Sequence, residues 1–265
     1  MDTFLSLFLK TGDQIVLVPL TVIGFIFFKR DAWGQAISLY LFTMIFVYAL
    51  KITFQVPLNP IFGVGKYSFP SGLMQATFVY FGWLFLCTRS TIYRALITFI
   101  LLGVASALLY FGYVGPIDIL GSLGFGIITL YVFANFIVPK YKNRPAKTSG
   151  ILWVAFIILF AGVAIVQGRV AEHLWLPFFV FPGFAFIWML FEEDLRGKST
   201  SIGRSFFAFC TVLVVVYCLL SLIPLIKTFN YPVYVSYLPW FLVGACLPFV
   251  VKVYSRFSHI RKLHR

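Results

Sequence analysis

Apolar stretches long enough to cross a lipid bilayer recur along this chain of 265 residues, and they limit its fold more than any other feature. A helix needs about 20 apolar residues to span a hydrocarbon core of about 30 Å. Only 11% of the residues are charged and 61% are hydrophobic, whereas a soluble domain carries about a quarter charged residues. We therefore predict an all-α, polytopic transmembrane helix bundle of about nine spans. The expected spans are residues 14–28, 34–55, 71–87, 95–112, 118–138, 150–167, 174–191, 205–226 and 235–254.

The basic residues predict the orientation of these spans. Cytoplasmic loops of membrane proteins are enriched in Lys and Arg, and 16 of the 21 basic residues fall in alternate loops or in the C-terminal tail. The other five, which we assign to the opposite side, are Lys10, Lys51, Lys66, Arg169 and Lys227. This bias places the N-terminus outside and the C-terminus inside. It also explains the net charge of +13 without nucleic acid as a partner, because the basic residues form no single face or tail.

The chain is expected to contain four parts. Residues 1–13 lack a signal-peptide cleavage site and suit an amphipathic segment in the membrane interface. Residues 14–140 form a first helix bundle, residues 150–254 an additional bundle of four spans, and residues 255–265 a basic cytoplasmic tail. The acidic cluster Glu192, Glu193 and Asp194 is expected in a solvated loop, paired with Arg196 and Lys198.

The cysteines and histidines give no sign of a metal or cofactor. All four cysteines lie in or at the ends of expected spans, without a CxxC pair or a nearby histidine. We therefore interpret these cysteines as small, buried apolar residues. We therefore expect no metal, no cofactor and no disulfide framework.

The stretch KYSFPSGLMQATFVYFGW, residues 66–83, is the most informative local pattern. A Pro-Ser-Gly turn opens an expected span at the outer surface, where Ser71 can cap the helix and Gly72 lets an anion approach the backbone. The free N–H groups and the dipole at a helix start favour a phosphate or a carboxylate. An ordinary helix start has the same pattern.

Two further polar residues fall on the same outer side. Lys51 lies near the outer end of the second expected span, and Asp118 opens the fifth. An ionisable residue at the boundary of a span is a candidate for function. For Asp118, capping of its own helix is an equally good explanation.

At these residues the sequence resembles the type 2 phosphatidic acid phosphatase and haloperoxidase superfamily, over roughly residues 34–140. Members of that family carry a Lys that is separated by six residues from an Arg-Pro pair, then Pro-Ser-Gly-His, then a block of Ser-Arg, His and Asp. Lys51 matches the first Lys, residues 70–72 match the turn, and Asp118 matches the last Asp. The resemblance implies a lipid-phosphate site in a helical membrane domain, and a bacterial inner membrane as its location.

The sequence departs from the family where the chemistry takes place. In the family one His attacks phosphorus and the other protonates the leaving group, whereas this chain has Val114 and Leu73 at those two positions. Leu58 and Asn59 stand at the Arg-Pro positions, and Leu108 stands at the Arg of the last block. Since neither Leu nor Val transfers protons, no intact catalytic set is expected. The expected phosphate-binding residues are Lys51, Asn59, Lys66, Ser71 and Gly72.

Three functions remain open at this point. In the first, the chain is a pseudoenzyme that binds a phospholipid or polyprenyl-phosphate head group at the outer leaflet without hydrolysing it. In the second, it is an active lipid phosphatase or phosphotransferase, acting on phosphatidic acid or undecaprenyl diphosphate through unfamiliar residues, or such an enzyme that substitution has inactivated. In the third, it is a transporter or a structural subunit that binds a membrane-protein partner through the last four spans.

Overall fold

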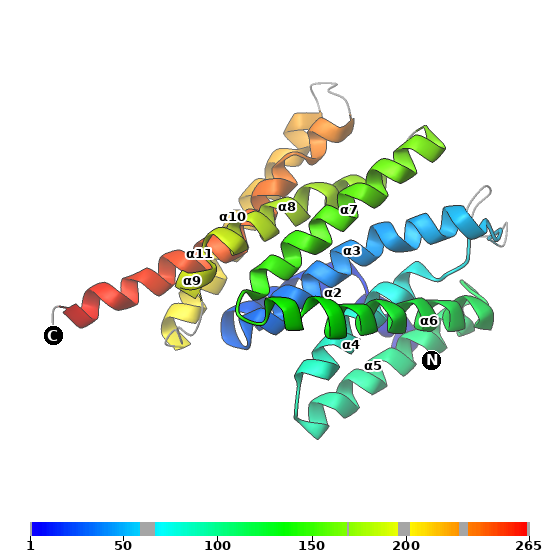
Figure 1. The fold of residues 1–265 in the computed structure, drawn as a ribbon, viewed down its shortest axis with the longest axis horizontal. Helices are drawn as coiled ribbons and strands as arrows, with labels where there is room; N and C mark the ends of the chain where they lie inside the picture. Colours follow the sequence, from blue (N-terminus) through cyan, green and yellow to red (C-terminus); the bar gives the residue numbers. More distant parts are fainter. Residues whose placement is uncertain (1, 59–66, 169, 196–201, 228–232, 264–265) are drawn as a thin grey trace. The chain divides into compact units, whose positions relative to one another are not determined.

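The computed structural model describes residues 2–58, 67–168, 170–195, 202–227 and 233–263, and these residues are almost entirely helical (Figure 1). They contain no β-strand, only one isolated bridge between Pro57 and Tyr67. The α-helices are α1 (Asp2–Thr11), α2 (Gln14–Phe27), α3 (Arg30–Phe54), α4 (Gly72–Cys87), α5 (Thr91–Tyr110), α6 (Pro116–Val132), α7 (Pro145–Gln167), α8 (Trp175–Leu190), α9 (Glu192–Leu195), α10 (Ile202–Lys227) and α11 (Pro239–Leu263). A π-helical turn, Phe133–Ile137, continues α6, and short 3₁₀ turns precede α8 and α11.

Seven helical segments in the described part of the chain are long and apolar enough to cross a membrane, as an all-α membrane protein requires. They are α3, α5, α6 with its π-helical turn, α7, α8, α10 and α11. Two of the nine expected spans correspond to shorter helices, the 14-residue α2 and the 16-residue α4. At 1.5 Å per residue these helices are only about 21 and 24 Å long. α1 and α2 meet at a bend of 53° and together could form one further broken span.

The chain divides into two compact units. One consists of Met1–Thr21 with Gln35–Lys142, and the other of Val22–Gly34 with Asn143–Arg265. The break at residue 142 lies in the basic loop between the two expected bundles. Residues 22–34, which the sequence gives no reason to separate from the first bundle, belong to the second unit.

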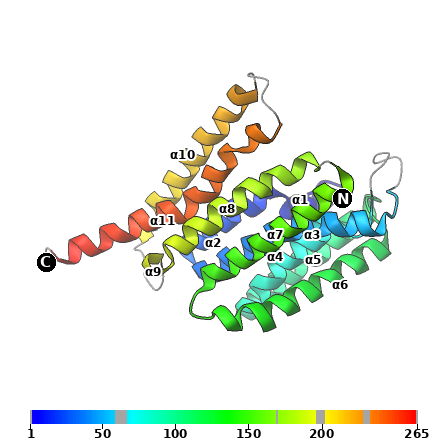
Figure 2. The same ribbon diagram turned by 45° about the horizontal axis from the view of Figure 1, so that its top comes forward.

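In the first unit α4 packs against both α5 and α6, and α1 packs against α5 (Figure 2). Most of α4 is buried, as suits a helix that is apolar on all sides. Glycines of α6 make room for aromatic rings: a β-carbon on Gly121 would overlap the ring of Phe69, and one on Gly126 the ring of Phe78. Phe8 of α1 is buried against Gly103 of α5, where a β-carbon would likewise overlap its ring.

The amphipathic α1 therefore uses part of its apolar surface within the protein. Phe8 is buried, and Leu5 and Leu9 pack against an apolar cluster between α4, α5 and α6. Phe4 and Leu7 are more than half exposed. Only these last two side chains remain available to lipid in the way expected for an interfacial segment.

The second unit is built on a close crossing of α8 and α11. A β-carbon on Gly183 would overlap the carbonyl oxygen of Phe241, and one on Gly244 would overlap the carbonyl oxygen of Val180. Small residues allow this backbone approach, which is a common means of helix association in membranes. Aromatic rings fill the space between α7 and α8, where Phe160 and Phe178 lie 4.4 Å apart between ring centroids.

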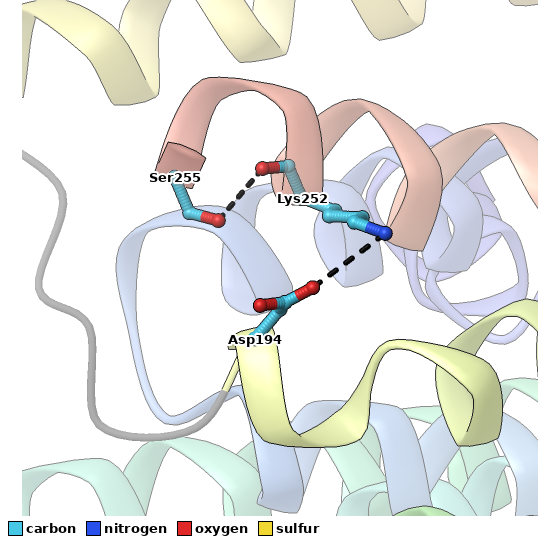
Figure 3. Close-up of polar contacts among 3 residues, drawn as sticks. All are labelled: Asp194, Lys252 and Ser255. Atoms are coloured by element: carbon cyan, nitrogen blue, oxygen red, sulfur yellow. Dashed lines mark hydrogen bonds and ion pairs between the residues drawn. The ribbon is translucent and has the colours of Figure 1, made fainter. Parts of the chain in front are cut away.

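The acidic cluster at the end of α8 is not simply solvated. Glu192 is buried, and its Oε1 accepts a hydrogen bond of 2.8 Å from the backbone N–H of Ala146 at the start of α7. Asp194 pairs with Lys252 of α11 at 3.5 Å (Figure 3), and the Lys252 ammonium also lies 3.0 Å above the ring centroid of Phe191. The expectation of a solvated loop is thus wrong for Glu192. The expected partners Arg196 and Lys198 lie outside the described residues.

Candidate functional site

Three segments assigned to the outer side meet in the first unit: the end of α3, residues 67–72, and the start of α6. The Lys51 ammonium of α3 donates hydrogen bonds to the carbonyl oxygens of Tyr67 at 2.7 Å and Ser68 at 3.3 Å. An ammonium carries three donors, so these two carbonyls leave one for another acceptor. Lys51 is partly buried, and its Cε lies 4.0 Å from the place where a β-carbon of Gly72 would be.

Ser68 links Lys51 to Asp118. Its carbonyl accepts from Lys51, while its hydroxyl donates to Asp118 Oδ1 at 3.3 Å. The other carboxylate oxygen of Asp118 accepts a hydrogen bond of 2.8 Å from the backbone N–H of Gly115. Ser68 and Asp118 are both buried. Asp118 therefore caps its own helix and also holds the segment that precedes α4.

The starts of α4 and α6 are joined through their backbones. The N–H of Ser71 donates to the carbonyl of Asp118 at 3.3 Å, and the Ser122 hydroxyl lies within hydrogen-bond distance of the carbonyls of Ser71 (2.9 Å) and Asp118 (2.6 Å). The Ser71 hydroxyl accepts from the N–H of Met74 at 3.5 Å, a long capping bond. The start of α4 thus lies next to Lys51 and is joined to the start of α6.

This arrangement is suited to an anion. The N–H groups of Gly72 and Leu73 are in the first turn of α4, where an α-helix offers no carbonyl partner. A β-carbon at Gly72 would meet Val47 only at 3.4 Å, an ordinary van der Waals distance. Packing therefore does not require glycine at this position, and a glycine at a helix start lets an anion approach the backbone N–H groups.

The positions at which the family has catalytic residues are apolar and lie together. Leu73 and Val114 both pack against one apolar cluster, and Leu108 belongs to its buried core together with Phe8 and Met74. A side chain that transfers protons is therefore absent at all three positions. Leu73, Val114 and Leu108 thus belong to one continuous apolar region of the first unit.

Two of the expected site residues, Asn59 and Lys66, lie outside the described residues. The geometry therefore brings together Lys51, Ser71, Gly72 and Asp118 of the residues selected from the sequence.

Two residues of the site were missed from the sequence, Ser68 and Ser122. Ser122 lies four residues after Asp118 and hence on the same face of α6, a spacing that could have indicated it. Ser68 lies in an irregular segment, and no pattern in the sequence reveals its contact with a residue fifty positions away.

Comparison with known proteins found no family model, no curated protein and no solved structure that matches this chain.

Proposed function

We propose that this chain is a membrane protein that binds a phosphate-bearing lipid head group at the outer leaflet without hydrolysing it, as a degenerate relative of the type 2 phosphatidic acid phosphatases. The proposal rests on one observation, that a polar site and an apolar cluster lie next to each other in the first unit. Lys51 and two helix starts converge on one polar site, while Leu73, Val114 and Leu108 form or line an apolar cluster.

The polar region has the charges and donors that a phosphate requires. Lys51 supplies a cation, and the first turn of α4 supplies the backbone N–H groups of Gly72 and Leu73 and a positive dipole end. The negative charge of Asp118 is held by hydrogen bonds from Gly115 and Ser68. Phosphoryl transfer through a histidine is not available, because a nucleophile and its acid act as a unit and both positions are apolar.

The proposal includes the topology predicted from charge: nine spans, N-terminus outside and C-terminus inside, in a bacterial inner membrane. Two sets of contacts agree with it. Lys51, Ser71 and Asp118, all assigned outside, converge in the first unit. In the second unit, three contacts join segments that are all assigned to the inside. They are Glu192 with Ala146, Asp194 with Lys252, and Arg30 with the Leu195 carbonyl at 2.7 Å.

Thermal unfolding of the purified chain in detergent tests the lipid site. Phosphatidic acid should raise the melting temperature more than diacylglycerol with the same acyl chains, because only the former carries a phosphate. Lys51→Ala should abolish most of this difference and Ser71→Ala should reduce it. Lys140→Ala, which removes a lysine from the loop assigned inside, is the matched control and should retain it. Equal stabilisation by diacylglycerol would refute the proposal.

A further inference from the structure

Gln75 of α4 is fully buried, and neither its amide nitrogen nor its amide oxygen has a hydrogen-bond partner in the part of the chain that the structure describes. Burial of an unpaired amide is costly, and buried polar groups in folded proteins are nearly always satisfied. The amide offers donors and an acceptor at the same place. A single ligand group that satisfies both amide atoms must therefore donate one hydrogen bond and accept another.

Contacts between α3 and α4 locate this amide relative to the polar site. Lys51 and Val47 of α3 lie against Gly72, at the start of α4. Further into the bundle, the rings of Tyr40 and Tyr80 lie 6.2 Å apart between centroids. Because Tyr40, Val47 and Lys51 are spaced by seven and four residues, they share one face of α3. The two helices therefore run antiparallel along this face.

Gln75 lies on α4 between these two contacts. It follows Gly72 by three residues and Ser71 by four, so it shares their face of the helix one turn deeper. Side chains of an α-helix point back toward its N-terminus. This direction places the Gln75 amide toward the start of α4, whose Gly72 lies against Lys51.

We propose that Gln75 forms the inner wall of the head-group site and binds a hydroxyl group of the ligand, next to the phosphate at Lys51 and the helix start. This inference rests on the proposed function and narrows its ligand. An ionised phosphodiester oxygen only accepts hydrogen bonds, whereas a hydroxyl both donates and accepts, as the Gln75 amide requires. The ligand is then a phosphate ester with a hydroxyl close to phosphorus, as in a glycerol-phosphate or sugar-phosphate head group.

Thr77 is a second buried polar residue of α4 and serves as a control for Gln75. Its hydroxyl is also buried and lacks a partner among the described residues. It faces Gly12, where a β-carbon would overlap Thr77 Oγ1, and it lies two residues from Gln75, on another face of α4. Removal of this hydroxyl therefore tests the effect of an unpaired polar group away from the site.

Thermal stabilisation of the full chain by two lipids of equal charge tests the proposal. Phosphatidylglycerol and phosphatidylpropanol with identical acyl chains have the same charge and the same number of head-group carbons, and differ only in the two head-group hydroxyls. The wild type should be half-stabilised at a phosphatidylglycerol concentration about fivefold lower than that of phosphatidylpropanol, the effect of one neutral hydrogen bond. In Gln75→Met, which keeps the length of the side chain, this preference should vanish while stabilisation by phosphatidylpropanol persists. Thr77→Val should keep the preference.

The outcomes separate this inference from the proposed function. Equal stabilisation of the wild type by the two lipids, both above diacylglycerol, overturns the role of Gln75 and leaves the phosphate site standing; this comparison needs no variant. A preference for phosphatidylglycerol that survives in Gln75→Met also overturns it. Soluble glycerol phosphate and propyl phosphate repeat the comparison without acyl chains, and a fivefold preference there shows that the head group alone is recognised.

Discussion

Gly183 of α8 and Gly244 of α11 each lie against the backbone of the opposite helix, so the two helices cross with no side chain between them at this point. A methyl group at either position would overlap a carbonyl oxygen, which cannot move as a side chain can. We expect Gly183→Ala or Gly244→Ala to lower the free energy of unfolding by about 2 kcal/mol or more, since the helices must separate. Thermal unfolding in detergent measures the change.

Gly162→Ala in α7 is the matched control for this crossing. A β-carbon there meets nothing within 4 Å, and alanine favours the helix more than glycine does. Its melting temperature should equal or exceed that of the wild type. A loss as large as that of the crossing variants would show that α8 and α11 are not held by this approach.

Glu192 gives a second prediction, on the start of α7. Its carboxylate accepts the N–H of Ala146, so Glu192→Ala removes a buried cap and should cost about 1–2 kcal/mol of unfolding free energy. Glu193 is exposed and Glu193→Ala should change stability by less than about 0.5 kcal/mol. Equal melting temperatures for the two variants would contradict a specific role of Glu192.

The helix positions could be predicted from hydropathy, because each long apolar stretch folds on its own as a helix in lipid. The short helix α2 was expected at residues 14–28 and is observed at Gln14–Phe27. Its bend of 53° from α1 could not be predicted, because it has no signal in the hydropathy of the chain. For the site, the alternation of basic and less basic loops was enough to assign Lys51, Ser71 and Asp118 to the same side of the membrane. The links through Ser68 and the buried amide of Gln75 depend on contacts between distant segments, which carry no local signal.

A double substitution tests whether the two histidines of the family would give this chain phosphatase activity. Leu73→His with Val114→His places both family histidines in the expected frame, but their sites line an apolar cluster. We expect no release of inorganic phosphate from phosphatidic acid and a loss of about 1 kcal/mol of stability for each partly buried imidazole. Leu73→Met with Val114→Ile is the volume-conserving control. Phosphate release by the folded double variant would instead support an inactivated enzyme.

Asp118→Asn tests whether Asp118 only caps its helix or also contacts the ligand. The substitution removes the negative charge nearest to the proposed phosphate and one of two acceptor oxygens that bind Gly115 and Ser68. Stability should fall by about 1 kcal/mol, while the apparent affinity for phosphatidic acid should rise on the order of tenfold. Titration of the melting temperature with lipid measures both. A weakening like that of Lys51→Ala would mean that Asp118 itself contacts the ligand.

The proposed topology predicts opposite labelling of two loops. In a cysteine-free background, Tyr113→Cys lies between α5 and α6, and Asn143→Cys lies in the basic loop before α7. Tyr113 is exposed, so its cysteine should react with a membrane-impermeant maleimide in intact cells. The Asn143 variant should react only after the membrane is opened, because Lys and Arg of that loop hold it inside. The reverse pattern would place Lys51 and the start of α4 at the cytoplasmic surface, and the head-group site would then face the inner leaflet.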